Sequence, residues 1–390
     1  MSNLTDTKTK ARVIAFYLPQ FHPTPENDLW WGKGFTEWTN VGKAKPLFKG
    51  HLQPRVPADL GYYDLRIPEV REAQAQMAKE AGIEGFCYWQ YWFSHDKQLL
   101  TMPFNEVLKS GKPDFPFCLG WANHDWTNKS WDIGTRKQKK QTLMEMIYSE
   151  EEYTKHFYDN LPAFKDKRYI TVDGKPLFYI FAPSAIPDPK GFISLWQKLA
   201  KENGLKGIYF VGLGFSMRAD EINAKNTLFN HAPDKAAENF GKILQMGFDA
   251  VNARGYNRAD FMTRSWLEKV WRSVVMRVFK YIPVSKIKQK EINKYLYVKE
   301  EKEENIFPTL LPNWDRSPRS GRKARVYYES TPEVFEEQIK QVLRLIQDKP
   351  YEHRIVFLQS WNEWAEGNYV EPDLVYGHGY LDALKRQLMQ

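Results

Sequence analysis

Two glutamates three residues apart are the side chains of this chain best suited to chemistry. Glu363 and Glu366 follow the apolar run 355–358 and are flanked by tryptophans. Cleavage of a glycosidic bond commonly uses two carboxyl groups with different pKa values, and apolar rings exclude water and offer a flat surface to a sugar. On a strand the two side chains would point to opposite faces, so they can act together only if the chain turns. Ala365 and Gly367 permit a helical turn, in which such a pair become neighbours.

Apolar runs of β type alternate with helical patterns along the chain, which is typical of a parallel sheet with helical crossovers. Eight runs qualify, the number that a (β/α)8 barrel requires: 13–18, 85–89, 117–121, 177–181, 208–212, 248–252, 309–312 and 355–358. Helical spacing predicts crossovers at 68–81, 150–164, 189–203 and 331–348. Thr331, followed by a proline, is a suitable N-cap for the last of these helices.

A barrel of this kind needs about 250 residues, so a chain of 390 residues must contain long insertions. We expect them at 20–63, 123–150 and 255–307. The sequence shows no internal repeat and no linker. We therefore predict one α/β domain, residues 1–390, a (β/α)8 TIM barrel with long insertions in the loops that follow its strands and a basic helical insertion at about 255–307.

In such barrels the ligand binds where the strands end. Aromatic and hydrogen-bonding residues follow six of the eight predicted strands, which suits a polyhydroxylated ligand; Arg254 and Tyr256, for example, follow the sixth. Taken singly, Trp and Tyr clusters more often pack than bind, but their gathering at strand ends favours a binding site. This rule selects as substrate-binding candidates Gln20, His22, Tyr91, Trp92, Asn123, Asp125, Trp126, Trp314, Trp361, Asn362 and Trp364.

Nothing in the sequence indicates a metal or a cofactor. His22, His95 and His124 lack the spacing of a metal site, so a hydrogen-bonding role is favoured for each. Cys87 and Cys118 each lie in an apolar run. Buried free thiols are therefore expected rather than a disulfide or a nucleophile, and a reducing compartment fits that expectation.

The positive charge is concentrated in one segment. The chain has a net charge of +8, and residues 264–290 hold eight Lys or Arg against Glu268 alone. A local excess argues against nucleic-acid binding. Apolar residues of this segment recur at helical spacing, so it predicts either a helix resting on an anionic membrane or a helix packed on the barrel with buried tryptophans.

The sequence also bears on the location of the protein. No stretch reaches the length of about 18 apolar residues that a membrane span needs, and residues 1–6 contain no apolar leader. We expect a cytoplasmic or membrane-peripheral protein, or a periplasmic one if a signal peptide has been removed.

Several motifs together carry a family resemblance. They are residues 15–22 (AFYLPQFH), 26–27 (EN), 30–32 (WWG), 34–40 (GFTEWTN), 121–123 (WAN) and 361–367 (WNEWAEG). This set is similar to the WbsX-type family found in bacterial surface-polysaccharide loci, and the similarity spans nearly the whole chain. That family is related to glycoside hydrolase family 99, the endo-α-mannosidases and endo-α-mannanases, which are metal-independent (β/α)8 barrels acting with retention. Its members have long been labelled glycosyltransferases.

The resemblance implies particular roles. Glu366 would be the general acid/base that protonates the leaving oxygen. Glu363 would deprotonate the sugar 2-hydroxyl, so that O2 attacks the anomeric carbon through a 1,2-anhydro sugar, in place of the usual carboxylate nucleophile. Tyr17 resembles an active-site tyrosine of the family. Trp31, Glu37 and Trp38 belong to the family pattern and are expected in a substrate loop.

The favoured hypothesis is a glycoside hydrolase-like enzyme that cleaves an α-linked oligo- or polysaccharide with retention and without metal, in polysaccharide metabolism. One alternative is a glycosyltransferase of surface-polysaccharide (lipopolysaccharide or O-antigen) biosynthesis. The lack of an Asp-x-Asp motif and of a phosphate-binding glycine loop argues against it. Another is a non-catalytic glycan-binding barrel, against which stands the presence of both glutamates.

Overall fold

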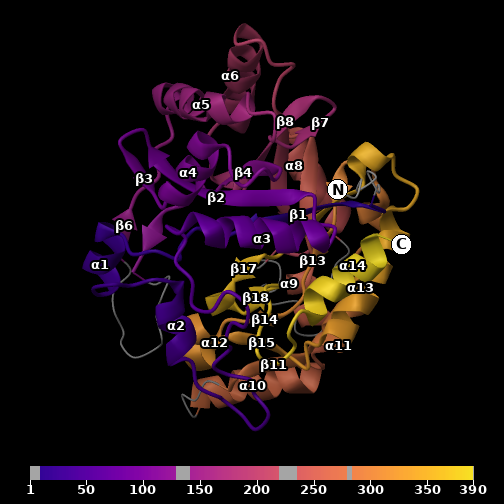
Figure 1. Cartoon of the computed structure of the whole chain (residues 1–390). Coiled ribbons are helices and arrows are strands. Elements are labelled where there is room, and N and C mark those ends of the chain that lie inside the picture. The colour runs from indigo at the N-terminus through magenta and orange to yellow at the C-terminus, as the bar shows by residue number, and fades with distance from the viewer. Residues whose placement is uncertain (1–8, 129–140, 219–234, 279–282, 390) are drawn as a thin grey trace.

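The computed structural model describes residues 9–128, 141–218, 235–278 and 283–389, and its centre is a barrel of parallel strands (Figure 1). The barrel path runs β12-β10-β9-β8-β4-β2-β1-β16-β13, and every neighbouring pair on it is parallel. In chain order these strands are β1 (Arg12–Tyr17), β2 (Gly85–Ser94), β4 (Phe117–Trp121), β8 (Lys175–Ile180), β9 (Tyr209–Phe215), β10 (Ala250–Arg254), β12 (Ile306–Phe307), β13 (Thr309–Leu310) and β16 (Ile355–Leu358).

The two ends of this path meet in the chain. Only Pro308 separates β12 from β13, so these two segments are one strand position of a nearly closed barrel. A proline has no N–H to give to a ladder, but its carbonyl still accepts from the Phe357 N–H at 3.0 Å. The prediction of an eight-stranded α/β TIM barrel is confirmed, with its seventh strand divided at Pro308.

Aromatic side chains fill the barrel interior. Phe16 stacks on Trp89 and on Phe357, with ring centroids 4.7 and 5.2 Å apart, and the Tyr179 ring stands edge-on to Phe16 at 4.9 Å. These rings come from four different strands. Because successive residues of a strand point to opposite faces, their neighbours in sequence point outward to the surrounding helices.

The helices cover the outside of the barrel. The four predicted crossovers are found at α3 (Pro68–Glu80), α5 (Glu150–Phe164), α6 (Pro189–Glu202) and α13 (Pro332–Ile346), and the Thr331 hydroxyl caps the last by accepting from the Val334 N–H. The helices α4 (Met102–Ser110), α8 (Ala236–Gln245) and α14 (Gly379–Leu388) were not predicted. Figure 1 shows α13 and α14 side by side near both termini, where the Lys10 N–H donates to the Leu388 carbonyl at 3.0 Å.

The three segments expected to be insertions contain further helices and strands, and the third, 255–307, ends within the barrel strand β12. The first contains α1 (Pro25–Trp31) and α2 (Glu37–Lys43), and the second contains β5 (Trp126–Thr127) and β6 (Thr142–Met144), while its residues 129–140 lie outside the described part. The third contains α9 (Tyr256–Thr263), α10 (Trp266–Val278), β11 (Ser285–Lys288), α11 (Gln289–Asn293) and the short helix η3 (Lys299–Lys302). Strand β11 pairs with β15 (Arg325–Tyr328), which pairs with β14 (Trp314–Asp315), so the third insertion is joined to the loop after the seventh strand.

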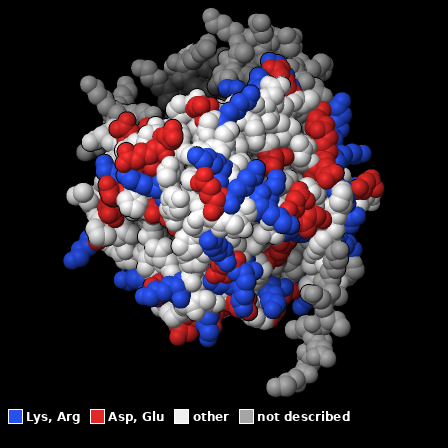
Figure 2. Space-filling model, turned by 90° about the horizontal axis from the view of Figure 1, so that it is seen from above, with Lys and Arg blue, Asp and Glu red and all other residues white. Residues whose placement is uncertain are grey.

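Two further expectations can be compared with the structure. Cys87 and Cys118 face each other on β2 and β4, and both are buried and free, as predicted. Among the described helices none is long and apolar enough to cross a membrane. Figure 2, seen from the side of α5 and α6, shows Lys and Arg interspersed with Asp and Glu, whereas the helix α10 of the basic segment lies at the opposite end of the molecule in Figure 1.

Candidate active site

A pocket of about 310 Å³ lies at the carboxyl ends of the barrel strands and contains both glutamates. Its walls come from seven strand positions and the loops that follow them. The lining residues are Phe16, Leu18, Gln20, Trp89, Tyr91, Ala122, His124, Trp126, Phe181, Arg254, Tyr256, Trp314, Arg316, Arg319, Gln359, Glu363 and Glu366. Aromatic faces and polar groups thus meet at the mouth of the barrel, as the strand-end rule predicted.

The predicted turn brings the two glutamates together. Glu363 ends the short strand β17 (Asn362–Glu363), and the following residues form the 3₁₀ turn η6 (Trp364–Glu366). Gly367 caps the turn with φ of +58°, and a Cβ there would lie 2.7 Å from the Asp315 backbone oxygen. Only glycine fits this position, because both the left-handed backbone and the close neighbour exclude a side chain. In a 3₁₀ turn residues three apart lie on the same side, so both carboxylates face the pocket.

Arg319 links three carboxylates. It lies on the short helix α12 (Ser317–Ser320), after the seventh strand. Its Nη1 contacts Glu366 Oε1 at 2.5 Å and Glu363 Oε1 at 3.3 Å, and its Nη2 contacts Glu37 Oε1 at 2.9 Å. The same oxygen of Glu37 accepts from the Ala365 N–H at 2.9 Å. Glu37 therefore binds both the arginine and the backbone of the turn that carries Glu366.

The surrounding charges shift the pKa values of the two catalytic candidates in opposite directions. Burial and the nearby charge of Glu366 raise the pKa of Glu363 to about 7. Burial would also raise the pKa of Glu366, but Arg316, whose Nη2 lies 3.1 Å from Glu366 Oε1, and Arg319 outweigh it and hold this pKa below its ordinary value. At neutral pH Glu366 is thus ionised, while Glu363 is poised between its two protonation states.

A second buried carboxyl anchors the turn from the other side. Glu371 accepts from Trp364 Nε1 at 2.6 Å, from the Tyr63 hydroxyl at 2.9 Å and from Gln74 Nε2 at 2.6 Å. Burial raises its pKa to about 7. Trp364 also stacks on Tyr369 of β18 (Asn368–Tyr369), with ring centroids 3.8 Å apart. Trp364 is fully buried and therefore fixes the turn instead of facing a ligand.

Six of the sequence candidates line the pocket. These are Gln20, Tyr91, Trp126, Trp314, Glu363 and Glu366. Trp126 stands edge-on to Tyr91 at 5.0 Å, so the loop after β4 and the end of β2 form one aromatic wall. Trp314 packs against Tyr256 at 5.0 Å on another wall.

Several other candidates support the pocket without lining it. Asn362 binds the Leu18 backbone through both its amide oxygen (2.7 Å) and its amide nitrogen (3.1 Å), which ties the last strand to the first. Asn123 likewise binds both backbone groups of Ala182. The remaining members of this group are Glu37, Trp38, Asp125, Trp361 and Trp364. None of these residues lines the pocket, and each contacts or lies among the segments that surround it.

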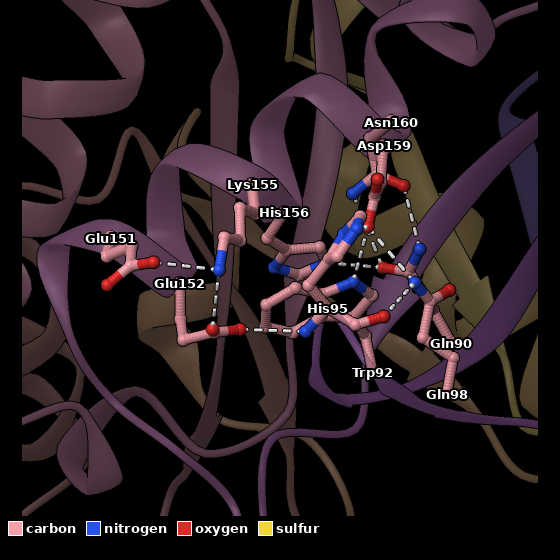
Figure 3. Close-up of polar contacts among 10 residues, drawn as sticks. All are labelled: Gln90, Trp92, His95, Gln98, Glu151, Glu152, Lys155, His156, Asp159 and Asn160. Carbon is pink, nitrogen blue, oxygen red and sulfur yellow. Dashed lines mark hydrogen bonds and ion pairs between the residues drawn. The ribbon is translucent and has the colours of Figure 1, made fainter.

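Trp92 lies on the far side of β2 from the pocket. Its Nε1 donates to Asp159 Oδ2 at 3.0 Å, and its ring stacks on His156 of α5 at 4.2 Å (Figure 3). The same cluster includes His95, whose Nδ1 lies 3.2 Å from Asp159 Oδ2. The strand β2 continues to Ser94, five residues beyond its predicted end, so Tyr91 and Trp92 point to opposite faces.

Tyr17, His22 and Trp31 also lie outside the pocket lining. The Tyr17 hydroxyl donates to Gln74 Oε1 at 2.6 Å, in the contact between β1 and α3, because Phe16 occupies the inward position of this strand. His22 is buried, and burial lowers its pKa. Trp31 packs against Phe35, with centroids 6.1 Å apart. A direct contact of Tyr17 with substrate, as the resemblance implied, does not fit this placement.

The strand-end rule missed the arginines that matter most to the glutamates. Arg316 and Arg319 come one and four residues after Asp315, and a search that continued past the end of β14 would have reached both. The apolar lining residues Phe16, Trp89 and Phe181 were also missed, since from sequence alone they are indistinguishable from core. Within the described residues no group of three or more His, Cys, Asp or Glu is arranged to hold a metal ion.

Comparison with known proteins places this barrel in a family. Residues 13–384 match the sequence profile described as Glycosyltransferase WbsX. The chain belongs to the WbsX family. Curated relatives in two strains of Xanthomonas campestris pv. campestris, both named Uncharacterized protein WxcX, are 32% and 33% identical over 379 residues, which is 97% of this chain. The match covers 50% of each relative, so the chain spans about half the length of these proteins.

One solved structure agrees with the fold at a TM-score above 0.5. A glycoside hydrolase-like protein superposes with a TM-score of 0.56 at 15% identity, covering 99% of this WbsX-family chain and 96% of the other. An endo-α-mannosidase of glycoside hydrolase family 99 from Bacteroides thetaiotaomicron, in complex with bis-tris propane, gives a TM-score of 0.49 at 15% identity, covering 96% and 95%. At such identities the likeness concerns the barrel architecture.

Proposed function

We propose that this WbsX-family chain is a glycan-active enzyme that cleaves an α-linked oligo- or polysaccharide with retention and without a metal ion. The observation that carries the proposal is the convergence of Glu363 and Glu366 on one arginine nitrogen inside a pocket walled by aromatic rings. Two carboxyls of different pKa beside sugar-sized aromatic surfaces are what glycosidic cleavage needs.

The spacing of the pair supports retention. Both carboxylate oxygens contact Arg319 Nη1, at 2.5 and 3.3 Å, so the two oxygens are no further apart than these distances combined. That separation is short of the roughly 6.5–9.5 Å with which inverting enzymes leave room for a water between the carboxyls. A closely spaced pair is compatible with a retaining reaction through either a glycosyl-enzyme or a 1,2-anhydro sugar.

The pair is expected to work with one proton between them. That proton favours Glu363, because Arg316 and Arg319 stabilise the ionised form of Glu366. The family resemblance assigns proton donation to Glu366 and proton abstraction from O2 to Glu363. For that assignment the proton must sit on Glu366 in the complex, so the bound glycan has to draw Arg316, 40% of whose side chain is exposed, away from it.

The pH dependence of kcat/KM follows from this proton. We expect a bell-shaped profile, since the singly protonated pair is the active form whichever glutamate carries the proton. Activity is lost above about pH 7, where the pair gives up its proton, and again in acid, where Glu366 takes up a second one below its ordinary range. Initial rates from about pH 3 to pH 9 measure both limbs. A plateau that extends to pH 9 would contradict the proton count.

A substrate screen tests the function itself. Bacterial polysaccharides and host and plant glycans are incubated with the protein, and products are identified by mass spectrometry. We expect hydrolysis products that form equally well with and without EDTA. The family description favours one alternative, a glycosyltransferase. Transfer from a nucleotide sugar, or a loss of activity in EDTA that Mg²⁺ or Mn²⁺ restores, would support that alternative.

We also propose that α10 contacts an anionic membrane surface. Leu267, Trp271, Val274 and Val278 are exposed by 62, 55, 47 and 66% and recur at helical spacing. The alternative expectation, a packed helix with buried tryptophans, does not fit Trp271. Residues 279–282, at the end of the predicted helical pattern, lie outside the described residues. The same stretch of sequence is rich in Lys and Arg, which attract anionic lipid headgroups.

Sedimentation with vesicles checks the membrane proposal. We expect the protein to pellet with phosphatidylserine-containing vesicles at low ionic strength, and binding to weaken as salt screens the charges. Trp271→Glu should lower binding strongly. Tyr158→Glu, a change at an exposed aromatic residue of α5, serves as the control and should not. Failure of the unmodified protein to pellet with anionic vesicles in low salt would contradict the proposal.

A further inference from the structure

Arg254 is a buried cation whose environment differs from that of the other pocket arginines. It ends β10, lines the pocket and is only 5% exposed. Its guanidinium lies over the rings of Phe16 (5.3 Å) and Phe181 (5.9 Å), beside the Tyr179 phenol. Its Nε has no hydrogen-bond partner, and no carboxylate in the described part of the chain comes within ion-pair distance of it.

The neighbouring arginines are neutralised within the protein. Arg319 contacts Glu37, Glu363 and Glu366, and Arg316 contacts Glu366. A buried charge is costly unless a counter-ion meets it, and contact with aromatic faces offsets only part of that cost. Arg254 therefore lacks the counter-ion that a buried arginine ordinarily has.

The uncompensated charge of Arg254 also affects the cleavage reaction. Positive charge develops at the anomeric carbon as a glycosidic bond breaks. A guanidinium that faces the same pocket opposes that charge unless an anion lies between or beside them. Arg254 is also close enough to Glu363 for its charge to lower the pKa of that carboxyl. A negative group on the ligand would remove both effects.

Resting on the proposed function, we infer that the glycan carries an anionic group, a carboxylate or a phosphate, which binds Arg254 next to the bond that is cleaved. The guanidinium fork matches either group with two parallel hydrogen bonds. A carboxylate would come from a uronic acid-type sugar, and a phosphate from a phosphorylated sugar. The enzyme would then act on acidic rather than neutral glycans.

Matched ligands test this inference by calorimetric titration. The first pair of probes is an oligosaccharide mixture containing glucuronic acid and the same mixture after reduction of its carboxyl groups. The second pair is glucose 6-phosphate and glucose. We expect the anionic member of at least one pair to bind about tenfold or more tightly, because charge-assisted bonds in a buried site are strong. The pair that shows the preference identifies carboxylate or phosphate.

Variants then assign the preference to Arg254. In Arg254→Gln the ratio of anionic to neutral affinity should fall towards one. Arg386→Gln is the control, because it removes an equal charge from an exposed arginine of α14 that pairs with Glu336 of α13. This variant should keep the affinity ratio of the unmodified protein. Equal affinity of the unmodified protein for both members of each pair, no binding of either anionic probe at millimolar concentration, or a preference that survives Arg254→Gln would overturn the inference.

The outcome is separable from that of the proposed function. Cleavage of neutral glycans without any anionic preference would uphold the function and overturn this inference. An anionic preference that depends on Arg254, with no cleavage of any glycan, would uphold the inference and contradict the function.

Discussion

Replacing either glutamate of the proposed catalytic pair should reduce turnover at least a hundredfold and leave the fold intact. General acid–base catalysis typically raises the reaction rate 10²–10⁴-fold. Neither Glu363→Gln nor Glu366→Gln changes the volume of the side chain appreciably, so the fold should be kept. The steady-state rate on the substrate found by the screen measures the loss, and thermal unfolding measures the fold. Near-unmodified activity in either variant would remove that residue from the proposed pair.

A substrate with an activated leaving group shows which glutamate is the acid. If Glu366 protonates the leaving oxygen, Glu366→Gln should recover much of its rate on an aryl glycoside whose leaving group needs no proton. Glu363→Gln should recover little, since its task does not depend on the leaving group. Rescue of Glu363→Gln alone would reverse the two roles and agree with the raised pKa of Glu363 and the lowered pKa of Glu366.

Removal of Arg319 should cost the fold about 3–5 kcal/mol near neutral pH, because three buried carboxylates would lose a shared partner. Arg319→Met is the variant, and denaturant unfolding is the measurement. Arg316→Met is the matched control: its side chain is 40% exposed and forms an ion pair with Glu366, so we expect a loss below about 1 kcal/mol.

The sign of the pH effect follows from Glu366. Arg316 and Arg319 hold its pKa below the ordinary value, so their contribution to stability is present above that ordinary value and is lost as the pH falls through the lowered one. The deficit of Arg319→Met should therefore shrink in acid, where the abandoned carboxyls take up protons. The alkaline limb of kcat/KM should also move to higher pH, because Arg319 lowers the pKa of Glu363. An equal deficit at pH 4 and pH 8 would contradict this account.

The parts of the molecule that follow local rules could be predicted from sequence. The apolar runs located the barrel strands because parallel strands are buried on both faces. The spacing of Glu363 and Glu366 indicated a turn because no strand could bring them together. The split at Pro308 was visible only in the structure, since the run that begins at Thr309 already satisfied the count of eight.

The parts that depend on distant contacts could not be predicted. Glu37 and Arg319 are 282 residues apart in the chain, and nothing local in either segment indicates that they meet beside the turn that carries Glu366. Whether Tyr17 and Trp92 point into the barrel or out of it depends on the register of their strands. A slip of one residue turns every side chain of a strand to the opposite face. The strand-end rule led to the pocket at the mouth of the barrel, but it could not tell which candidates line that pocket and which lie behind its walls.

The anomer released in the first turnovers shows whether Glu363 and Glu366 carry out a retaining reaction. Proton NMR of a cleavage reaction, begun immediately after mixing, distinguishes the α- and β-anomers of the new reducing end before they interconvert. We expect the unmodified protein to release the α-anomer of an α-linked substrate first and the double variant Glu363→Gln/Glu366→Gln to release none. Release of the β-anomer first, or cleavage by the double variant, would contradict a retaining reaction carried by this pair of glutamates.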